Sequence, residues 1–193
     1  PSRANLIYNN AFLKNDEARR REYLGKLEKG ETKINASTLF PHDIVHKYMS
    51  GWRVKANDAT IEALWKALPD TAKDCGNTIV VADGSGSMTS TVDNNSRVTA
   101  LEVANALAIY FAEHSSGQFK DKYITFSENP QFVDFSNCKT LHDKIQTALA
   151  HSEVANTNIE KVFNMILTTA INNRMSQEDL PKNILIISDM EFD

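Results

Sequence analysis

The sequence predicts an α/β protein with a mostly parallel sheet and one antiparallel edge strand, flanked by helices and preceded by an α-helical segment. Two short runs rich in Ile and Val, within residues 78–82 and 182–188, are typical of strands buried on both faces of a parallel sheet. From residue 78 onward strand and helix patterns alternate, which favours such a sheet. The residues before it show no strand pattern. We therefore expect a helical segment over residues 1–72 and an α/β domain over residues 73–193.

Start and stop signals divide the helical segment into three helices. Residues 16–29 are rich in helix formers and are followed by Gly30, a residue that commonly terminates helices. Pro41 is favourable in the first turn of a helix, so a second helix is expected from Pro41 to Met49. A third is expected from Ala59 to Leu68.

The α/β part begins with the strand at residues 78–82. After a polar insertion, a helix is expected at the capping box Thr99-x-x-Glu102. Residues 122–126 and 131–135 flank a turn-rich connector that contains a proline, which predicts a hairpin with an antiparallel edge strand. The remaining elements are two helices and the final strand, expected at residues 141–149, 158–174 and 182–188.

The turn Asp83-Gly84-Ser85-Gly86-Ser87 follows the first strand directly and carries one carboxylate and two hydroxyls. Asp83 falls at the carboxyl end of the strand. The two glycines are expected to fold the turn tightly enough to aim Ser85 and Ser87 at one point. This combination of oxygen groups suits a cation better than a phosphate.

Two more oxygen groups are expected to reach the same point from distant parts of the sequence. The final strand run ends in Asp189, and the carboxyl ends of strands in an open parallel sheet line up along one crevice. Thr157 lies in the loop that leads into the helix expected from residue 158. The candidate metal ligands are therefore Asp83, Ser85, Ser87, Thr157 and Asp189.

These residues resemble the metal-ion-dependent adhesion site of von Willebrand factor A domains, in which Asp-x-Ser-x-Ser is followed by a loop Thr and a strand-end Asp. All three parts occur here in the order of that family. The resemblance implies a Rossmann-like fold and a non-enzymatic module that captures a Glu or Asp side chain of a protein partner. Domains of that family continue through further strands, so the C-terminal strands are expected to be missing from this chain.

The residue types explain why such a site works. Hydroxyls are neutral ligands, and Asp83 and Asp189 are expected to act largely through bound waters or by orienting the hydroxyls. The ion then keeps much of its charge and attracts an anion. Mg²⁺ requires octahedral coordination at roughly 2.0 to 2.1 Å and would keep an open position for a carboxylate. We expect Mg²⁺, with Mn²⁺ or Ca²⁺ as alternatives.

Strings over nearly the whole chain, such as residues 33–36 and 188–193, resemble an uncharacterised domain family of bacteria, viruses and plants. Its members join a helical region to a von Willebrand A module. A more distant similarity is to the Ro (TROVE) autoantigen group, which implies RNA binding by the helical segment as an alternative function. The candidate residues for RNA contact are chosen for their positive charge and not from this similarity, and they are Arg19, Arg20, Arg21, Lys26, Lys29 and Lys33.

Charge is unevenly distributed along the chain, whose net charge is −4. Residues 1–70 carry 12 Lys and Arg against 9 Asp and Glu, so the rest of the chain, which contains the proposed cation site, is acidic. A basic face can meet RNA. A solvated helix surface is the simpler interpretation, because glutamates interleave with these bases.

Other classes of site fit the sequence less well. A phosphate-binding loop needs a lysine after its second glycine, and none follows Gly86. An aspartyl phosphotransferase would need a second acid where Ser85 stands. His42 and His46 share a helix face, but Asp43 replaces the glutamate of the zinc-protease pattern. We expect no enzymatic activity, with metal-assisted phosphoester hydrolysis as the alternative.

Composition is that of an ordinary globular protein, with 41% hydrophobic and 24% charged residues among 193. No apolar stretch reaches the roughly 18 residues that a membrane helix needs. The two cysteines, Cys75 and Cys138, lack a CxxC spacing and are expected to be reduced thiols. The sequence therefore predicts an intracellular, cytoplasmic protein that does not span a membrane.

Overall fold

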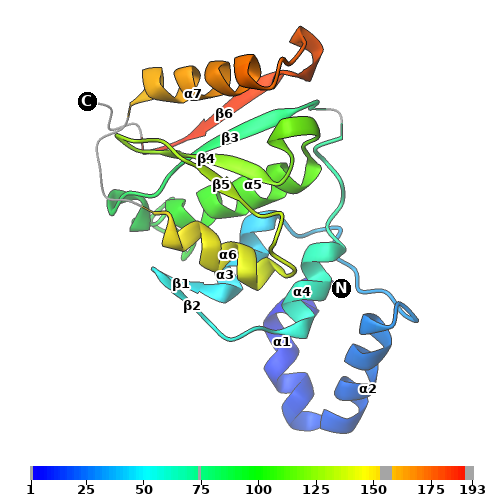
Figure 1. Ribbon diagram of the computed structural model, residues 1–193. Coiled ribbons are helices and arrows are strands. Elements are labelled where there is room, and N and C mark those ends of the chain that lie inside the picture. The colour runs from blue at the N-terminus through cyan, green and yellow to red at the C-terminus, as the bar shows by residue number, and fades with distance from the viewer. Residues whose placement is uncertain (1, 74, 153–157, 190–193) are drawn as a thin grey trace.

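The structure is a computed structural model that describes residues 2–73, 75–152 and 158–189. Within these residues the chain forms a mixed α/β fold with seven α-helices and a four-stranded, mostly parallel sheet (Figure 1). The α/β class expected from the sequence is confirmed.

Most elements lie where the sequence predicts them. The helices are α1 (Ser2–Asn15), α2 (Glu17–Glu28), α3 (Pro41–Tyr48), α4 (Ala59–Lys66), α5 (Ala100–His114), α6 (Leu141–Ala150) and α7 (Ile159–Asn172). The strands are β1 (Met49–Ser50), β2 (Arg53–Val54), β3 (Thr78–Asp83), β4 (Lys122–Phe126), β5 (Phe132–Asp134) and β6 (Asn183–Ile187). The helix α1 and the short β1–β2 hairpin were not expected in the helical segment.

The main sheet has the strand order β5-β4-β3-β6. The central strand β3 pairs in parallel with β4 and β6, and β5 pairs antiparallel with β4 at one edge, as expected for the hairpin. Asp83 is in register with Phe126 of β4, and Ala82 is in register with Ile187 of β6. The carboxyl ends of β3, β4 and β6 therefore lie together along one side of the sheet, here called the carboxyl edge.

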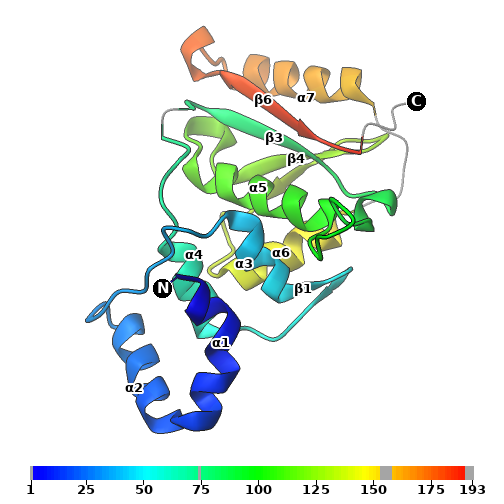
Figure 2. The ribbon, with the colours of Figure 1, turned by 180° about the vertical axis from the view of Figure 1, so that it is seen from behind.

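Helices cover both faces of the sheet. Figures 1 and 2 show α7 on one face and α3, α5 and α6 on the other. Successive side chains of a strand point to opposite faces, so Val80 and Ala82 of β3 join the larger core with α5, and Ile79 and Val81 join the smaller core with α7. The strand β3 is buried along its whole length.

The helix α5 begins where its capping box predicts. The Thr99 hydroxyl accepts the backbone N–H of Glu102, and the Glu102 side chain accepts the backbone N–H of Thr99 at 2.9 Å. Each side chain satisfies an amide that the first turn of a helix leaves without a partner. The capping box therefore sets the residue at which α5 begins.

The strand β6 is not buried on both faces, contrary to the sequence-based expectation. Among the described residues it pairs with β3 alone. Most of its residues are half-buried, and Asn183 is exposed. The apolar pattern identified a strand correctly, but an edge position and a central position give similar patterns.

The helices α3 and α4 belong to the larger core of the α/β part. Ile44, Val45 and Leu64 are buried in the same cluster as Leu101 of α5 and Ile145 of α6. In contrast, α1 and α2 form a hairpin that projects from one end of the molecule (Figure 1). The division at residues 72 and 73 stays a prediction.

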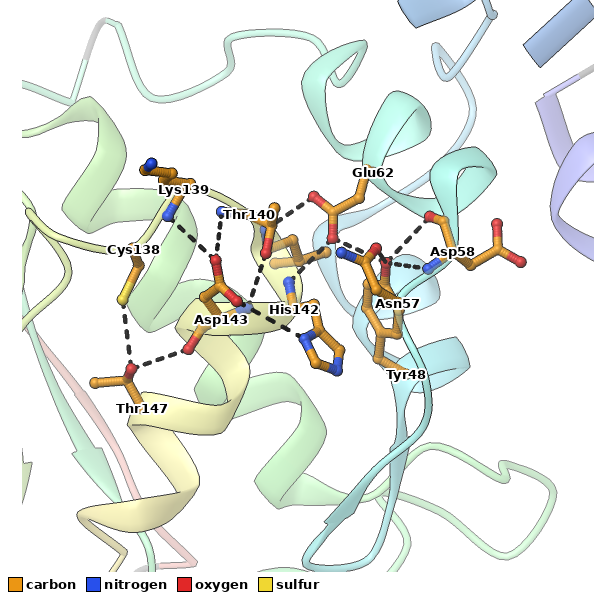
Figure 3. Close-up of polar contacts among 11 residues, drawn as sticks. Tyr48, Asn57, Asp58, Glu62, Cys138, Lys139, Thr140, His142, Asp143 and Thr147 are labelled. Atoms are coloured by element: carbon orange, nitrogen blue, oxygen red, sulfur yellow. Dashed lines mark hydrogen bonds and ion pairs between the residues drawn. The ribbon is translucent and has the colours of Figure 1, made fainter. Parts of the chain in front are cut away.

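A carboxylate from α4 connects three helices (Figure 3). Glu62 accepts the backbone N–H groups of Leu141 at 2.9 Å and His142 at 3.0 Å, in the first turn of α6. It also accepts the hydroxyl of Tyr48 in α3 at 2.8 Å. Burial raises the pKa of the Tyr48 hydroxyl above its usual value.

No helix in the described part of the chain has both the length and the apolar character needed to cross a membrane.

Candidate functional site

The turn after β3 brings its polar groups together at the carboxyl edge. The backbone N–H of Ser85 donates to Oδ1 of Asp83 at 2.8 Å, a local contact that curls the turn back on itself. The Oγ atoms of Ser85 and Ser87 lie 2.9 Å apart. Ser87 is exposed and Ser85 is half-buried. The two hydroxyls therefore meet at the surface, as the spacing predicts.

The glycines of this turn act differently from the expectation. Gly84 and Gly86 both have φ values that other residues adopt, so neither is required for an unusual backbone conformation. A Cβ atom at Gly84 would lie 3.0 Å from the backbone Cα of Ser152. A Cβ at Gly86 would meet nothing within 4 Å. Gly84 is needed because the loop after α6 packs directly against it.

Ser188 is a site residue that the sequence analysis missed. Its Oγ donates to Oδ2 of Asp83 at 3.0 Å. Ala82 is in register with Ile187. The residues that follow these two, Asp83 and Ser188, therefore lie side by side. A signal was present in the sequence, because Ser188 is the first polar residue after the apolar run of β6.

The other two candidate ligands are placed less fully. Asp189 follows Ser188 and is exposed at the carboxyl edge. Thr157 lies outside the described residues. The residue after it, Asn158, caps α7 by accepting the backbone N–H of Lys161 at 2.9 Å. The backbone N–H of Asn158 donates to the carbonyl oxygen of Ser127 at 3.3 Å, so α7 starts beside the end of β4.

The Asp83 carboxylate is buried without a cationic partner in the described structure. The residue is only 3% exposed. Its recorded donors, the Ser85 amide and the Ser188 hydroxyl, are neutral. Among the ion pairs of the described residues, none includes Asp83. Burying a charged carboxylate is costly unless a positive charge compensates it.

The donors at this edge suit a hard cation. Carboxylate and hydroxyl oxygens are the ligands that Mg²⁺ and Ca²⁺ prefer, whereas zinc sites are built from Cys and His with carboxylates. The described residues contain no group of three or more His, Cys, Asp and Glu side chains placed to share a metal ion.

The two histidines of α3 have separate partners. Nδ1 of His46 lies 2.9 Å from Oε2 of Glu102, the carboxylate of the α5 capping box. The His42 ring stacks on Phe40 with the ring centres 5.6 Å apart. These contacts are packing and capping interactions, and they give no support to a zinc site.

Arg20 is not available to RNA, which corrects the expectation for that residue. It is 7% exposed. Its guanidinium donates to Oδ1 of Asn5 at 3.0 Å and to Oδ1 of Asn9 at 2.9 and 3.1 Å. The guanidinium also lies over the rings of Phe12 and Tyr23. Arg20 therefore links α2 to α1 through hydrogen bonds.

The other basic residues of α2 are exposed, and two of them form ion pairs within their own helix. Arg21 pairs with Glu17, and Lys26 pairs with Glu22. Exposed pairs of this spacing contribute little to stability. These glutamates reduce the positive charge that α2 presents.

Comparison with known proteins identifies families without assigned functions. Residues 77–193 match the family described as Domain of unknown function (DUF7788), and residues 1–78 match Domain of unknown function (DUF2828). A protein of Acanthamoeba polyphaga mimivirus described as uncharacterized is 31% identical over 174 residues. The match covers 89% of this chain but 28% of the viral protein, so the chain spans less than a third of that relative. No solved structure matches the chain significantly.

Proposed function

The chain belongs to the DUF7788 family, which residues 77–193 match, and we propose that it is a non-enzymatic interaction module that binds a divalent cation at the carboxyl edge. Through this ion it captures a Glu or Asp side chain of a protein partner. Mg²⁺ is the proposed ion. The proposed ligands and supporting acids are Asp83, Ser85, Ser87, Thr157 and Asp189.

One observation carries the proposal: the buried Asp83 carboxylate lies beside two surface hydroxyls and has no cationic partner among the described residues. Both of its oxygens already accept a neutral donor. A carboxylate has about four acceptor positions, so a cation or its bound water still finds a free one. A divalent ion beside Asp83 would compensate the buried charge.

The residues of the edge have distinct parts in this proposal. The hydroxyls of Ser85 and Ser87 would hold the ion. Asp83 would orient them, since the Ser85 amide is bonded to its Oδ1, and Ser188 would hold Oδ2 in place. When bound, the ion supplies a positive centre with an open position for an incoming carboxylate. Thr157 belongs to the set on sequence grounds alone.

The same proposal assigns the von Willebrand A fold to the α/β part. Three features support this assignment. They are the central strand β3, which leads into the Asp-x-Ser-x-Ser turn, the antiparallel edge strand β5, and the helices on both faces of the sheet. The position of β6 beside β3 also agrees, because it brings the end of the final strand to the turn.

Metal binding is tested by thermal or urea unfolding with Mg²⁺ and with a chelator. A ligand at 100 times its Kd stabilises the folded state by about 2.7 kcal/mol. The free energy of unfolding of the wild-type protein should therefore rise by a similar amount when Mg²⁺ is added in such an excess. The double variant Ser85→Ala/Ser87→Ala and the variant Asp83→Asn should lose it. Ser90→Ala, an exposed serine three residues further along, is the matched control and should keep it.

Carboxylate capture is tested with peptides that carry a central Glu and matched peptides that carry Gln. Fluorescence polarisation should detect binding of Glu peptides with Mg²⁺ and none after chelation. Equal binding of the Gln peptides, or binding that survives the chelator, contradicts the proposed mode of capture.

A further inference from the structure

Ser127 carries a buried hydroxyl that has no hydrogen-bond partner in the described part of the chain. The residue is 2% exposed, and its Oγ is the one fully buried side-chain oxygen or nitrogen that lacks a partner among the described residues. Buried polar groups in folded proteins are nearly always hydrogen-bonded, so an exception calls for a specific explanation. Serine can donate one hydrogen bond and accept others.

Ser127 lies next to the proposed cation site. Ser127 follows the last residue of β4, Phe126, which is in register with Asp83. Ser127 and Asp83 line the same small cavity. Its volume of about 10 Å³ is close to the minimum that a single water molecule requires.

Several polar residues contribute to the lining of the cavity. Besides Asp83 and Ser127, it is lined by Asn105, Thr125 and Ser152, among other residues. Buried waters typically make about three hydrogen bonds to groups that otherwise lack partners. The carboxylate of Asp83 has acceptor positions beyond the two that Ser85 and Ser188 use.

We infer that this cavity binds one water molecule, which accepts or donates a hydrogen bond at Ser127 Oγ and donates one to the Asp83 carboxylate. Ser127 is then a positioning residue, because it fixes the carboxylate through the water. This inference rests on the proposed function, because the carboxylate is positioned for the cation.

The water also explains why a serine is tolerated at this buried position. An unpaired hydroxyl costs its full desolvation penalty, and a bound water removes that penalty. Removal of a group that is hydrogen-bonded to a metal ligand typically lowers the metal affinity by 10-fold to 100-fold. Loss of the Ser127 hydroxyl should therefore weaken cation binding without unfolding the protein.

The test compares the Mg²⁺ affinity of Ser127→Ala with that of wild-type protein by calorimetric titration. The Kd is expected to rise about 10-fold, while the melting temperature in chelator is not lowered. Ser115→Ala is the matched control. Ser115 is also a buried serine, at the opposite end of β3, and its hydroxyl donates to the Thr78 carbonyl at 2.9 Å. This control should lower the melting temperature and leave the Mg²⁺ Kd unchanged.

The outcomes separate the two proposals. If wild-type protein binds no Mg²⁺, the proposed function fails, and the role of Ser127 fails with it. If wild-type protein binds Mg²⁺ and Ser127→Ala binds it equally well, only the role of Ser127 is overturned. A crystal structure of the Mg²⁺-bound wild-type protein with no water in the cavity lined by Asp83 and Ser127 would also overturn it, independently of any variant.

Discussion

The carboxylate of Asp83 is held by groups from two strand ends that are about a hundred residues apart in the sequence. Ser85, on the same turn, binds one oxygen and Ser188, after β6, binds the other. Hydrogen bonds of this kind fix the orientation of a carboxylate, and so they determine how its oxygens face a cation. At the scale of single residues, the proposed cation site therefore depends on neutral hydrogen-bond donors as much as on acidic side chains.

Gly84 and Gly86 provide a matched pair for testing how the turn is held. Gly84→Ala should destabilise the protein by roughly 1 to 3 kcal/mol, because the new Cβ would lie 3.0 Å from the backbone of Ser152. Gly86→Ala meets open space at a φ of −63° and should stabilise the protein by about 0.4 to 1 kcal/mol. Urea unfolding measures both changes. Equal effects of the two substitutions would show that Ser152 does not restrict the turn.

At the scale of elements, Glu62 shows how a helix from the N-terminal segment supports the α/β part. The first amides of a helix have no partner within it, and α6 meets this need with a carboxylate from α4 (Figure 3). The helix α6 also has its own capping box. Hydrogen bonding to Thr140 lowers the pKa of Asp143 in that box. Local and distant groups thus fix the same helix start.

Glu62→Ala should cost about 2 kcal/mol of unfolding free energy, because it leaves two α6 amides without their side-chain acceptor and removes one of the three acceptors of the Tyr48 hydroxyl. Glu62→Gln keeps an acceptor oxygen and should cost less. Chemical denaturation of the two variants checks the order. A smaller loss for Ala than for Gln would show that the carboxylate does not stabilise this junction.

In helix α7 the sequence pattern predicts the helix, but the packing determines which of its apolar residues are buried. Its apolar residues recur at helical spacing, and a helix forms where they predict it. Val162 and Ile166 are buried against the sheet, whereas Phe163 and Leu167 are 50% and 57% exposed. The periodicity identified the helix but overestimated the width of its buried face.

At the scale of the whole molecule, the larger core extends across the predicted boundary at residue 72. It unites Leu64 and Trp65 of α4 with Ala104 and Ile109 of α5. The indole of Trp65 donates to Glu113 of α5 at 3.0 Å. Residues of α3 and α4 are therefore expected to unfold together with the sheet.

Native-state hydrogen exchange tests this expectation. Amides in α3 and α4 should exchange as slowly as those of α5, since all three helices share one core. Amides in α1 and α2 should exchange faster, because Arg20 is the one buried side chain described in these two helices. If α3 and α4 exchange with α1 and α2, the boundary at residue 72 separates two units that open independently.

Much of the fold was predictable because its signals are local. The capping box at Thr99, the proline-containing hairpin and the apolar run of β3 each specify an element through neighbouring residues. The same holds for the turn at Ser85 and Ser87, whose hydroxyls meet as their spacing predicts. Their role as metal ligands stays a prediction.

The sequence by itself determined the α/β class, most of its elements and the polar turn, since propensity, periodicity and capping act over a few residues. Only the tertiary structure decided that Ser188 binds Asp83, that Arg20 is buried and that the Ser127 hydroxyl has no partner among the described residues. These facts depend on strand register and on packing between distant segments. A difference of one residue in register changes which side chains meet, and no local pattern records that choice.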